Sequence, residues 1–581
     1  MSLVTQETIN EERPLSPSKA ARLRDLLEPY FGVQTEHLAI RMEETAERFR
    51  ARYPDFAKEV RALPHDAVLI TYADQLRAPG EKPLSVFSSW ASRHLDGLLG
   101  HIHFLPFFPS SSDEGFAVMD YRRIDPNFGD WRHVKELSSS FRLMIDAVVN
   151  HASAQGDWFH AFLAQDPPYL GYFREISPND DLSHVVRPRT TPLEKLVETS
   201  RGTKTVWTTF SSDQIDLDFS NPDVVVEIFD ILLDYTGHGA RMIRLDAIGF
   251  IWKESGTTCI HLDGAHAIIQ AYRLLFDVVA PSVLLVTETN VPHAENISYF
   301  GDGRSEAQLV YNFPLPPLLL DAVYRGDASR LAEWADTLEP PGDGCCFFNI
   351  TATHDGIGVR GAQDVLDADE INRLAEATLQ RRGLVSYRHT EQGTMSPYEL
   401  NITFFDAVRG PQDDPDDAVV IRRYLTVQSV ALSLAGVPGI YFHNLLGSLS
   451  DHEGLAGKDV TQTEFKRVLN RKRLEVSDVE ARLADPETRD ARVFAGYERR
   501  LKAWRENPAF APTAPQRILR LDERVLAVLR GDRVFCLHNF SNDAVPISLP
   551  TRARLTNLLD GTFVDGGAVQ LPPWGMAWLA S

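Results

Sequence analysis

Cysteine is scarce in this chain, with four residues among 581. No pair of them has the spacing of a zinc site, and the set is Cys259, Cys345, Cys346 and Cys536. So few cysteines in so long a chain exclude a disulfide-stabilised scaffold. The adjacent pair is expected to lie in a strand as small apolar residues. We expect neither a disulfide framework nor a bound metal.

Positive charge is also in short supply, since 59 lysines and arginines face 81 acidic residues, for a formal charge of −22. The resulting field repels polyanions and so argues against nucleic acid or an anionic membrane as a partner, but it permits a small anionic substrate. Long apolar runs are missing too, because no stretch approaches the roughly 18 consecutive apolar residues of a membrane span. The first residues, MSLVTQETINEERP, lack the pattern of a secretory signal. We expect a cytoplasmic protein.

Short apolar runs are plentiful, and most are separated by helical or loop patterns. Strands alternating with helices are typical of α/β folds, and eight of them indicate a (β/α)8 TIM barrel. The eight predicted strands lie at residues 66–72, 100–107, 142–150, 241–250, 282–290, 309–313, 346–355 and 437–443.

The remaining segments predict additions to the barrel. Residues 1–65 are expected to form an N-terminal helical extension, and residues 66–510 a catalytic barrel. Intervals rich in proline, glycine and charge predict inserted loop subdomains at about 152–208 and 356–404. Short apolar runs with turns between them predict a C-terminal antiparallel β domain at 511–581.

One predicted strand, RMIRLDAIGF at 241–250, carries two charges in an otherwise apolar segment. Arg244 and Asp246 are two residues apart, so they point to the same face of a strand. They form either an internal ion pair that satisfies itself or a catalytic carboxylate held by a guanidinium at the mouth of the barrel. This stretch alone favours neither interpretation.

Polar residues at the ends of three more predicted strands favour the catalytic interpretation. They are Asp146, Asn150 and His151 in the third strand, Glu288 in the fifth, and His354 and Asp355 in the seventh. Barrel enzymes place their chemistry at the carboxyl ends of the strands, where such residues meet.

The residue types fit cleavage of a glycosidic bond with retained configuration, which needs an ionised carboxylate and a protonated carboxyl group. Asp246 beside Arg244 is expected to stay ionised and act as nucleophile, because a nearby cation lowers the pKa of a carboxyl group. Glu288, with no cation adjacent in sequence, suits a proton donor.

The stretches DAVVNH, RLDAIG, VTETN and TATHD resemble, in order, the four signature regions of glycoside hydrolase family 13, the α-amylase family. The resemblance implies that Asp246 is the nucleophile, Glu288 the acid/base and Asp355 the stabiliser of the transition state. It also implies a supporting set of Asp146, His151, Arg244 and His354.

Other stretches resemble the sucrose phosphorylase branch of that family, among them LPFFPSSSDEGFAVMDY, RPRTTPL, TVWTTFSSDQIDLDF, GIGVR and LNRKR. In that branch the residues matching Asp113 and Arg471 hold the glucose. The residue matching Arg189 helps to bind phosphate, and those matching Phe210 and Gln214 line the acceptor side. A lone RPR stretch would favour a loop arginine paired with surface acids, but beside the other matching stretches phosphate binding is favoured for Arg189.

A closer resemblance is to the glucosylglycerate phosphorylase subgroup, through the helical preface, ETNVPH at 288–293 and SPYELN at 396–401. It implies acceptor positions at Asn290, Tyr398 and Glu399. The stretch from Lys458 to Arg473, which includes Arg467, is locally basic. It forms either an anion-binding loop or a solvated charged face.

The resemblance implies a retaining α-glucoside phosphorylase that forms a glucosyl intermediate on Asp246 and yields α-D-glucose 1-phosphate, with glucosylglycerate as the expected substrate. The alternatives are a sucrose, sucrose 6-phosphate or glucosylglycerol phosphorylase, then a hydrolase or transglucosidase of the family. A catalytically inactive binding protein is disfavoured by the intact carboxylates. Phosphate is expected as co-substrate, with no cofactor, and the protein as a monomer or homodimer.

Overall fold

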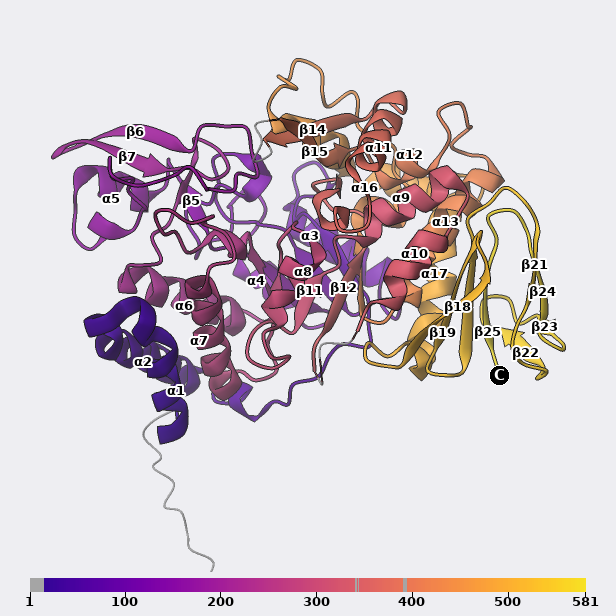
Figure 1. The fold of residues 1–581 in the computed structure, drawn as a ribbon, viewed down its shortest axis with the longest axis horizontal. Coiled ribbons are helices and arrows are strands. Elements are labelled where there is room, and N and C mark those ends of the chain that lie inside the picture. The colour runs from indigo at the N-terminus through magenta and orange to yellow at the C-terminus, as the bar shows by residue number, and fades with distance from the viewer. Residues whose placement is uncertain (1–14, 340–341, 343, 390–393) are drawn as a thin grey trace, which may run out of the picture.

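The computed structural model describes residues 15–339, 342, 344–389 and 394–581 (Figure 1). At its centre eight parallel strands close into a barrel in the order β1-β16-β12-β11-β10-β9-β4-β3. Their bounds are β1 (Val68–Thr71), β3 (His101–Phe104), β4 (Arg142–Val148), β9 (Ala240–Asp246), β10 (Leu284–Thr287), β11 (Leu309–Tyr311), β12 (Cys346–Ile350) and β16 (Val437–Tyr441). Each predicted run overlaps one barrel strand, so the predicted barrel is confirmed.

The barrel strands are almost wholly buried, because helices cover their outer side and side chains fill the interior. The larger helices between successive strands are α3 (Pro83–His94), α4 (Trp131–Leu137), α6 (Pro222–Gly237), α7 (Asp263–Val279), α9 (Leu315–Arg325), α10 (Ser329–Asp336), α13 (Ala418–Ser433) and, after β16, α17 (Arg489–Glu506). Helix α6 illustrates a local start signal: Pro222 is its first residue, and the Asn221 side chain accepts a hydrogen bond from the backbone N–H of Asp223.

Two connections are much longer than the rest and rise above the carboxyl ends of the strands. Between β4 and β9 lie β5 (His151–Ser153), α5 (Asp157–Ala164), the hairpin of β6 (Glu194–Thr199) with β7 (Gly202–Trp207), and β8 (Gln214–Asp216). After β12 come β13 (Ile357–Gly358), α11 (Ala368–Gln380), β14 (Leu384–His389) and β15 (Met395–Asn401). Both excursions lie at the top of Figure 1.

The N-terminal helices α1 (Pro17–Phe31) and α2 (Thr35–Arg52) pack against α6 and α7 on the outside of the barrel (Figure 1). Tyr30 and Phe31 meet the ring of Trp252 edge to face, with centroids 5.3 and 5.8 Å apart. Since Trp252 lies in the loop that follows β9, the N-terminal helices support the same loop that leads out from Asp246.

The C-terminal residues form a six-stranded antiparallel sheet in the order β18-β19-β20-β25-β22-β23, and β21 (Val545–Ser548) pairs with β24 (Ala568–Leu571) beside it. The sheet strands are β18 (Gln516–Asp522), β19 (Val525–Arg530), β20 (Val534–Asn539), β22 (Leu555–Asn557), β23 (Phe563–Val564) and β25 (Met576–Ala580). One face packs on the barrel helices, where Trp578 Nε1 donates to Ser433 Oγ at 3.1 Å. The predicted antiparallel β architecture is therefore present.

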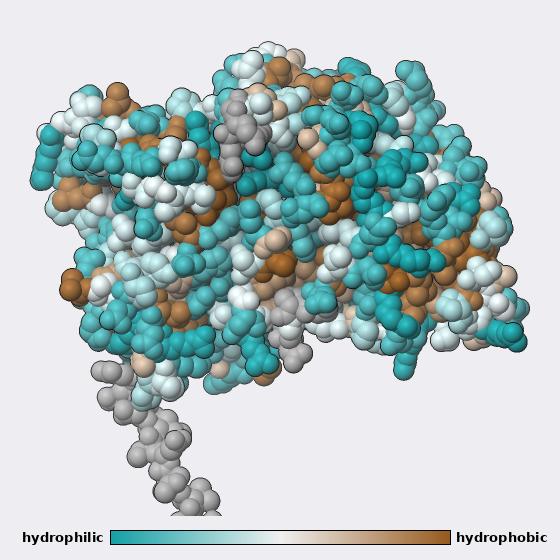
Figure 2. All heavy atoms as spheres, in the orientation of Figure 1, coloured by the Kyte–Doolittle hydropathy of each residue, from teal (hydrophilic) through white to brown (hydrophobic). Residues whose placement is uncertain are grey.

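The surface of the molecule is mainly hydrophilic on the face shown in Figure 2, with hydrophobic residues scattered among polar ones. Among the described residues, none of the helices combines the length and the apolar composition needed to cross a bilayer.

Candidate active site

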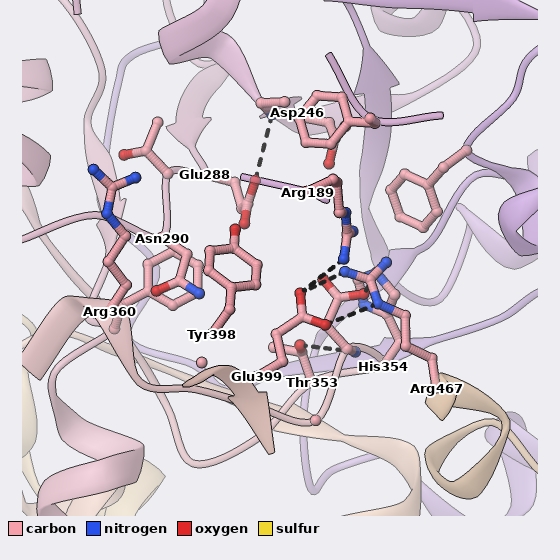
Figure 3. A pocket seen from close by; sticks show the side chains of 18 of the residues that line it. Arg189, Asp246, Glu288, Asn290, Thr353, His354, Arg360, Tyr398, Glu399 and Arg467 are labelled. Atoms are coloured by element: carbon pink, nitrogen blue, oxygen red, sulfur yellow. Dashed lines mark hydrogen bonds and ion pairs between the residues drawn. The ribbon is translucent and has the colours of Figure 1, made fainter. Parts of the chain in front are cut away.

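The carboxyl ends of four barrel strands converge on one pocket, shown in Figure 3. Of the residues singled out from the sequence, thirteen line it: Asp113, His151, Arg189, Phe210, Gln214, Asp246, Glu288, Asn290, His354, Asp355, Tyr398, Glu399 and Arg467. Arg244 and Arg471 donate to the lining residues Asp246 and Asp355 from behind it, and Asp146 accepts from Arg244. Asn150 is not among the lining residues and donates to Asp216. The structure thus brings together residues that are spread over more than half of the chain.

Arg244 is the centre of a buried charge cluster beneath the pocket. The register between β4 and β9 places it opposite Asp146, to which its Nη1 donates at 2.8 Å. The same nitrogen donates to Asp246 Oδ1 at 2.8 Å, as expected for two side chains on one strand face. Nη2 lies 3.6 Å from Glu288 Oε2. Asp146 also lies 3.2 Å from Nε2 of His103, so that its carboxylate is held from two sides.

The pKa of Asp246 differs from the sequence-based expectation, whereas the pKa of Glu288 is shifted in the direction expected of a proton donor. Burial raises the pKa of Asp246 well above its usual range, and the carboxylates of Glu288 and Asp146 add to this effect, whereas Arg244 opposes it. Burial also raises the pKa of Glu288, again against Arg244. Along the chain only the cation next to Asp246 is visible. Neither the burial of the two carboxyl groups nor the approach of Arg244 to Glu288 follows from the sequence.

Asp355 is held in the opposite state. Its Oδ1 lies 2.8 Å from Arg467 Nη1, 3.0 Å from Arg471 Nη2 and 3.3 Å from His354 Nε2. Burial alone would raise the pKa of this carboxyl group, but the two guanidiniums and the histidine outweigh burial and keep the pKa far below its usual range. Asp355 is therefore ionised at any ordinary pH.

The loop after β3 and the side chain of His354 build the wall beside Asp355. Arg471 Nη1 donates to Asp113 Oδ1 at 3.4 Å. Asp113 has a φ of +49°, a left-handed conformation that L-residues adopt mainly where the surroundings enforce it. Phe116, three residues later, stacks on His354 with centroids 5.0 Å apart and nearly parallel planes.

His151 and Gln214 form the floor next to this wall. His151 Nε2 lies 2.9 Å from the Phe116 carbonyl oxygen and 3.1 Å from Gln214 Nε2. Burial lowers the pKa of His151, so its ring is neutral near pH 7. The side chain therefore lines the pocket without adding charge.

The remaining wall carries cations and rings. Arg189 lies between the rings of Phe210 and Tyr398, at 6.0 and 5.9 Å from their centroids, with Nη1 at 3.6 Å from Glu399 Oε1. Arg467 Nη2 donates to Glu399 at 2.6 Å. The phenol of Tyr398 has a pKa raised to about 12 by burial, so it stays protonated.

The two central arginines of the basic stretch 458–473 do not lie on a solvated face, and they do not form a free cationic loop. Arg467 and Arg471 are 5% and 3% exposed and are paired with carboxylates of the pocket wall. Arg473 donates to Asp74 and Glu114, and Lys466 donates to the Val385 carbonyl. Local sequence could not show this pairing, because most of the acids involved lie at least 60 residues away along the chain.

Several lining residues were not singled out from the sequence. They are aromatic or polar side chains in the loops after the barrel strands, and the main ones are Phe116, Phe250, Phe313, Thr353 and Arg360. Arg360 is the last residue of the stretch GIGVR, which follows Asp355. Its charge, just after a motif at a strand end, is the feature of the sequence that could have indicated it. No signal in the sequence pointed to the rings, which are common in any core.

Comparisons with known proteins agree with this geometry. The family model "Alpha amylase, catalytic domain" matches residues 98–333. A glucosylglycerate phosphorylase of Allomeiothermus silvanus is 44% identical over 97% of this chain and 99% of its own length. A glucosylglycerate phosphorylase of Spirochaeta thermophila is 46% identical over 90% of this chain and 89% of its own.

The fold also has solved counterparts. The crystal structure of sucrose 6F-phosphate phosphorylase from Thermoanaerobacter thermosaccharolyticum superposes with a TM-score of 0.71 and 22% sequence identity, covering 88% of this chain and 99% of that chain. This likeness concerns the fold, while the two phosphorylases above match almost the whole sequence. The chain therefore belongs to glycoside hydrolase family 13, the α-amylase family, in the branch that includes these phosphorylases.

Proposed function

We propose that the protein is a retaining α-glucoside phosphorylase that converts glucosylglycerate and phosphate to α-D-glucose 1-phosphate and glycerate. The observation that carries this proposal is the 44% identity to a glucosylglycerate phosphorylase over nearly all of both chains. Phosphate acts as a co-substrate, no cofactor takes part in the reaction, and the enzyme works in the cytoplasm on small molecules.

In the first step Asp246 attacks the anomeric carbon of the glucosyl group, and the bond from that carbon to the glycerate oxygen breaks. Glu288 gives its proton to this oxygen, so glycerate leaves with a neutral hydroxyl group there rather than as an alkoxide. Both carboxyl groups have raised pKa values, and we assign the shared proton to Glu288. The reason is that Arg244 donates directly to Asp246 at 2.8 Å but lies 3.6 Å from Glu288.

In the second step a phosphate oxygen attacks the same carbon, and the bond to Asp246 breaks. The proton carried by the attacking phosphate passes to Glu288, which restores the starting site and gives α-D-glucose 1-phosphate. Two displacements at one carbon retain its configuration.

The permanent charge of Asp355 stabilises the positive charge that develops on the sugar in each transition state. Asp113, His151, His354 and Arg471 hold the glucosyl ring, while Asp146 fixes Arg244 in place beneath it. The support for these roles is the position of each side chain in the pocket wall or directly behind it.

On the acceptor side we assign phosphate to Arg189, since it lines the pocket and its Nη1 has no hydrogen-bond partner among the described residues. Phe210 and Tyr398 flank its guanidinium, and Gln214 and Asn290 complete this side. Arg467 and Glu399 are hydrogen-bonded to each other. We therefore assign them a structural role in the pocket wall rather than direct binding of an anion.

The proposal is tested by incubating glucosylglycerate with the enzyme in the presence and absence of phosphate and quantifying glucose and glucose 1-phosphate. A phosphorylase yields glucose 1-phosphate only when phosphate is present and releases little glucose without it. Equal release of glucose in both tubes would identify a hydrolase. Faster phosphorolysis of sucrose, sucrose 6-phosphate or glucosylglycerol would contradict the assigned acceptor.

A further inference from the structure

Arg360 and Asn290 lie on the same side of the pocket, away from Arg189 and Arg467 (Figure 3). Arg360 follows strand β13 in the excursion after β12, whereas Asn290 follows Glu288 at the end of β10. Tyr398 and Glu288 lie between this side and Arg189 in the view. The pocket therefore has cations on two separate walls.

The three pocket guanidiniums differ in how well the protein neutralises them. Arg467 has carboxylate oxygens at 2.6 and 2.8 Å, and Arg189 has one at 3.6 Å. Among the described residues, the acid nearest to Arg360 is Glu295 at 3.9 Å, whose side chain is 45% exposed and lies 3.3 Å from His261. Among the described residues, Arg360 is thus the pocket cation with the weakest internal partner, although it is only 7% exposed.

Arg360 and Asn290 also present complementary unsatisfied atoms. Within the described part of the chain, neither Nε of Arg360 nor Oδ1 of Asn290 has a hydrogen-bond partner, and both atoms are buried. A buried polar atom without a partner costs stability, so such atoms mark places that a ligand completes. One is a cationic donor and the other a neutral acceptor.

The amide of Asn290 lies against the backbone at Gly358. A Cβ atom at Gly358 would lie 2.3 Å from Asn290 Nδ2, so the absence of a side chain there lets the amide approach this backbone. Arg360 follows two residues later. The amide therefore lies beside the short segment that carries Arg360.

We propose that Arg360 binds the carboxylate of the acceptor and that Asn290 accepts a hydrogen bond from a hydroxyl group next to it, so that this wall selects a hydroxy acid. The inference rests on the proposed function. An arginine suits a carboxylate because its fork of N–H groups matches the two oxygens. Phosphate then binds to Arg189 on the other wall, and the two anionic co-substrates are recognised by different cations.

The test compares two reactions of R360Q with those of the wild-type enzyme. Synthesis from glucose 1-phosphate and glycerate, followed by phosphate release, uses the acceptor. Exchange of labelled phosphate into glucose 1-phosphate passes through the glucosyl enzyme and needs phosphate but no glycerate. We expect kcat/KM for glycerate to fall by about 100-fold in R360Q, because a charged hydrogen-bonded partner is lost, and exchange to fall by less than about tenfold.

Three further variants complete the design. R360K keeps the charge and should recover part of the glycerate activity, and N290A should raise the KM for glycerate more than that for phosphate. R189Q should show the reverse pattern of R360Q. R373Q is a matched control, since the Arg373 side chain on α11 is 65% exposed and lies outside the pocket, and it should change neither reaction.

Two outcomes would overturn the inference. Equal losses of synthesis and exchange in both R360Q and R360K would show that Arg360 supports the whole site, and a kcat/KM for glycerate within threefold of wild type would show that it does not bind the acceptor. The proposed function is tested separately, with the wild-type enzyme. If glycerate releases no phosphate from glucose 1-phosphate while another acceptor does, the acceptor assignment is wrong. The inference about Arg360 is then wrong as well.

Discussion

Arg467 Nη1 lies 2.8 Å from Oδ1 of Asp355, and both side chains belong to the wall of the same pocket. Together with Arg471, this arginine lowers the pKa of Asp355, which burial alone would raise. The basic stretch that contains both arginines thus acts inside the protein. It keeps a carboxylate of the pocket wall ionised.

Replacement of Arg467 should expose this dependence. In R467Q the pKa of Asp355 rises toward its usual range, because one of the cations that lower it is gone. An NMR titration should show Asp355 taking up its proton at higher pH in R467Q than in the wild type. We expect kcat/KM at neutral pH to fall about tenfold or more, because the cation that fixes this carboxylate is lost. An Asp355 pKa that is the same in R467Q, wild type and the control K472Q, whose lysine is partly exposed, would contradict this role.

Replacement of Glu288 should affect substrates according to their leaving groups. E288Q cannot donate a proton, so turnover of glucosylglycerate should fall by about 10²–10⁴-fold. α-D-Glucosyl fluoride needs no proton to release fluoride, and its first step should fall far less. Rates of fluoride and glycerate release measured side by side give the comparison, with the exposed residue Glu254 changed to Gln as control. Equal losses with both substrates would assign Glu288 a role other than acid.

The pH profile of the wild-type enzyme should reflect the raised pKa values of the carboxyl pair. Activity rises as the pH passes the value at which Asp246 ionises and falls as it passes the value at which Glu288 loses its proton. Both limbs should lie above the usual pKa values of 3.8 and 4.5 for these groups. They belong to the pair rather than to either residue. With α-D-glucosyl fluoride the alkaline limb should disappear, and its persistence would exclude Glu288 as its source.

Asp146 and Asp246 should differ in their effect on stability. Both oxygens of Asp146 accept from Arg244 at 2.8 Å, and the side chain is wholly buried, so D146N leaves the arginine poorly neutralised. We expect a loss of about 3–5 kcal/mol in the free energy of unfolding. D246N leaves Arg244 bonded to Asp146 and removes one of several crowded carboxylates, so it should abolish turnover at a much smaller cost. Thermal and denaturant unfolding of both variants measure whether D146N loses more stability than D246N.

Much of the architecture could be predicted because it follows from local pattern. The eight barrel strands are short apolar runs buried on both sides, and helical patterns or loops separate them. Asp246, Glu288 and Asp355 each follow or end such a run, and parallel strands bring their carboxyl ends to one edge. Strand alternation also predicted that Arg244 and Asp246 share a face, and they are hydrogen-bonded.

The sequence by itself thus determined the fold and which residues meet at the mouth of the barrel. Only the tertiary structure decided their electrostatic state, because that depends on burial and on charges distant along the chain. Arg244 contacts Asp146 as well as Asp246 and comes near Glu288, and Arg467 is neutralised by Asp355 and Glu399. Among the described residues, the acid nearest to Arg360 lies 3.9 Å away. A one-dimensional pattern fixes the face on which a side chain lies, but not the partner brought to it by another strand or loop.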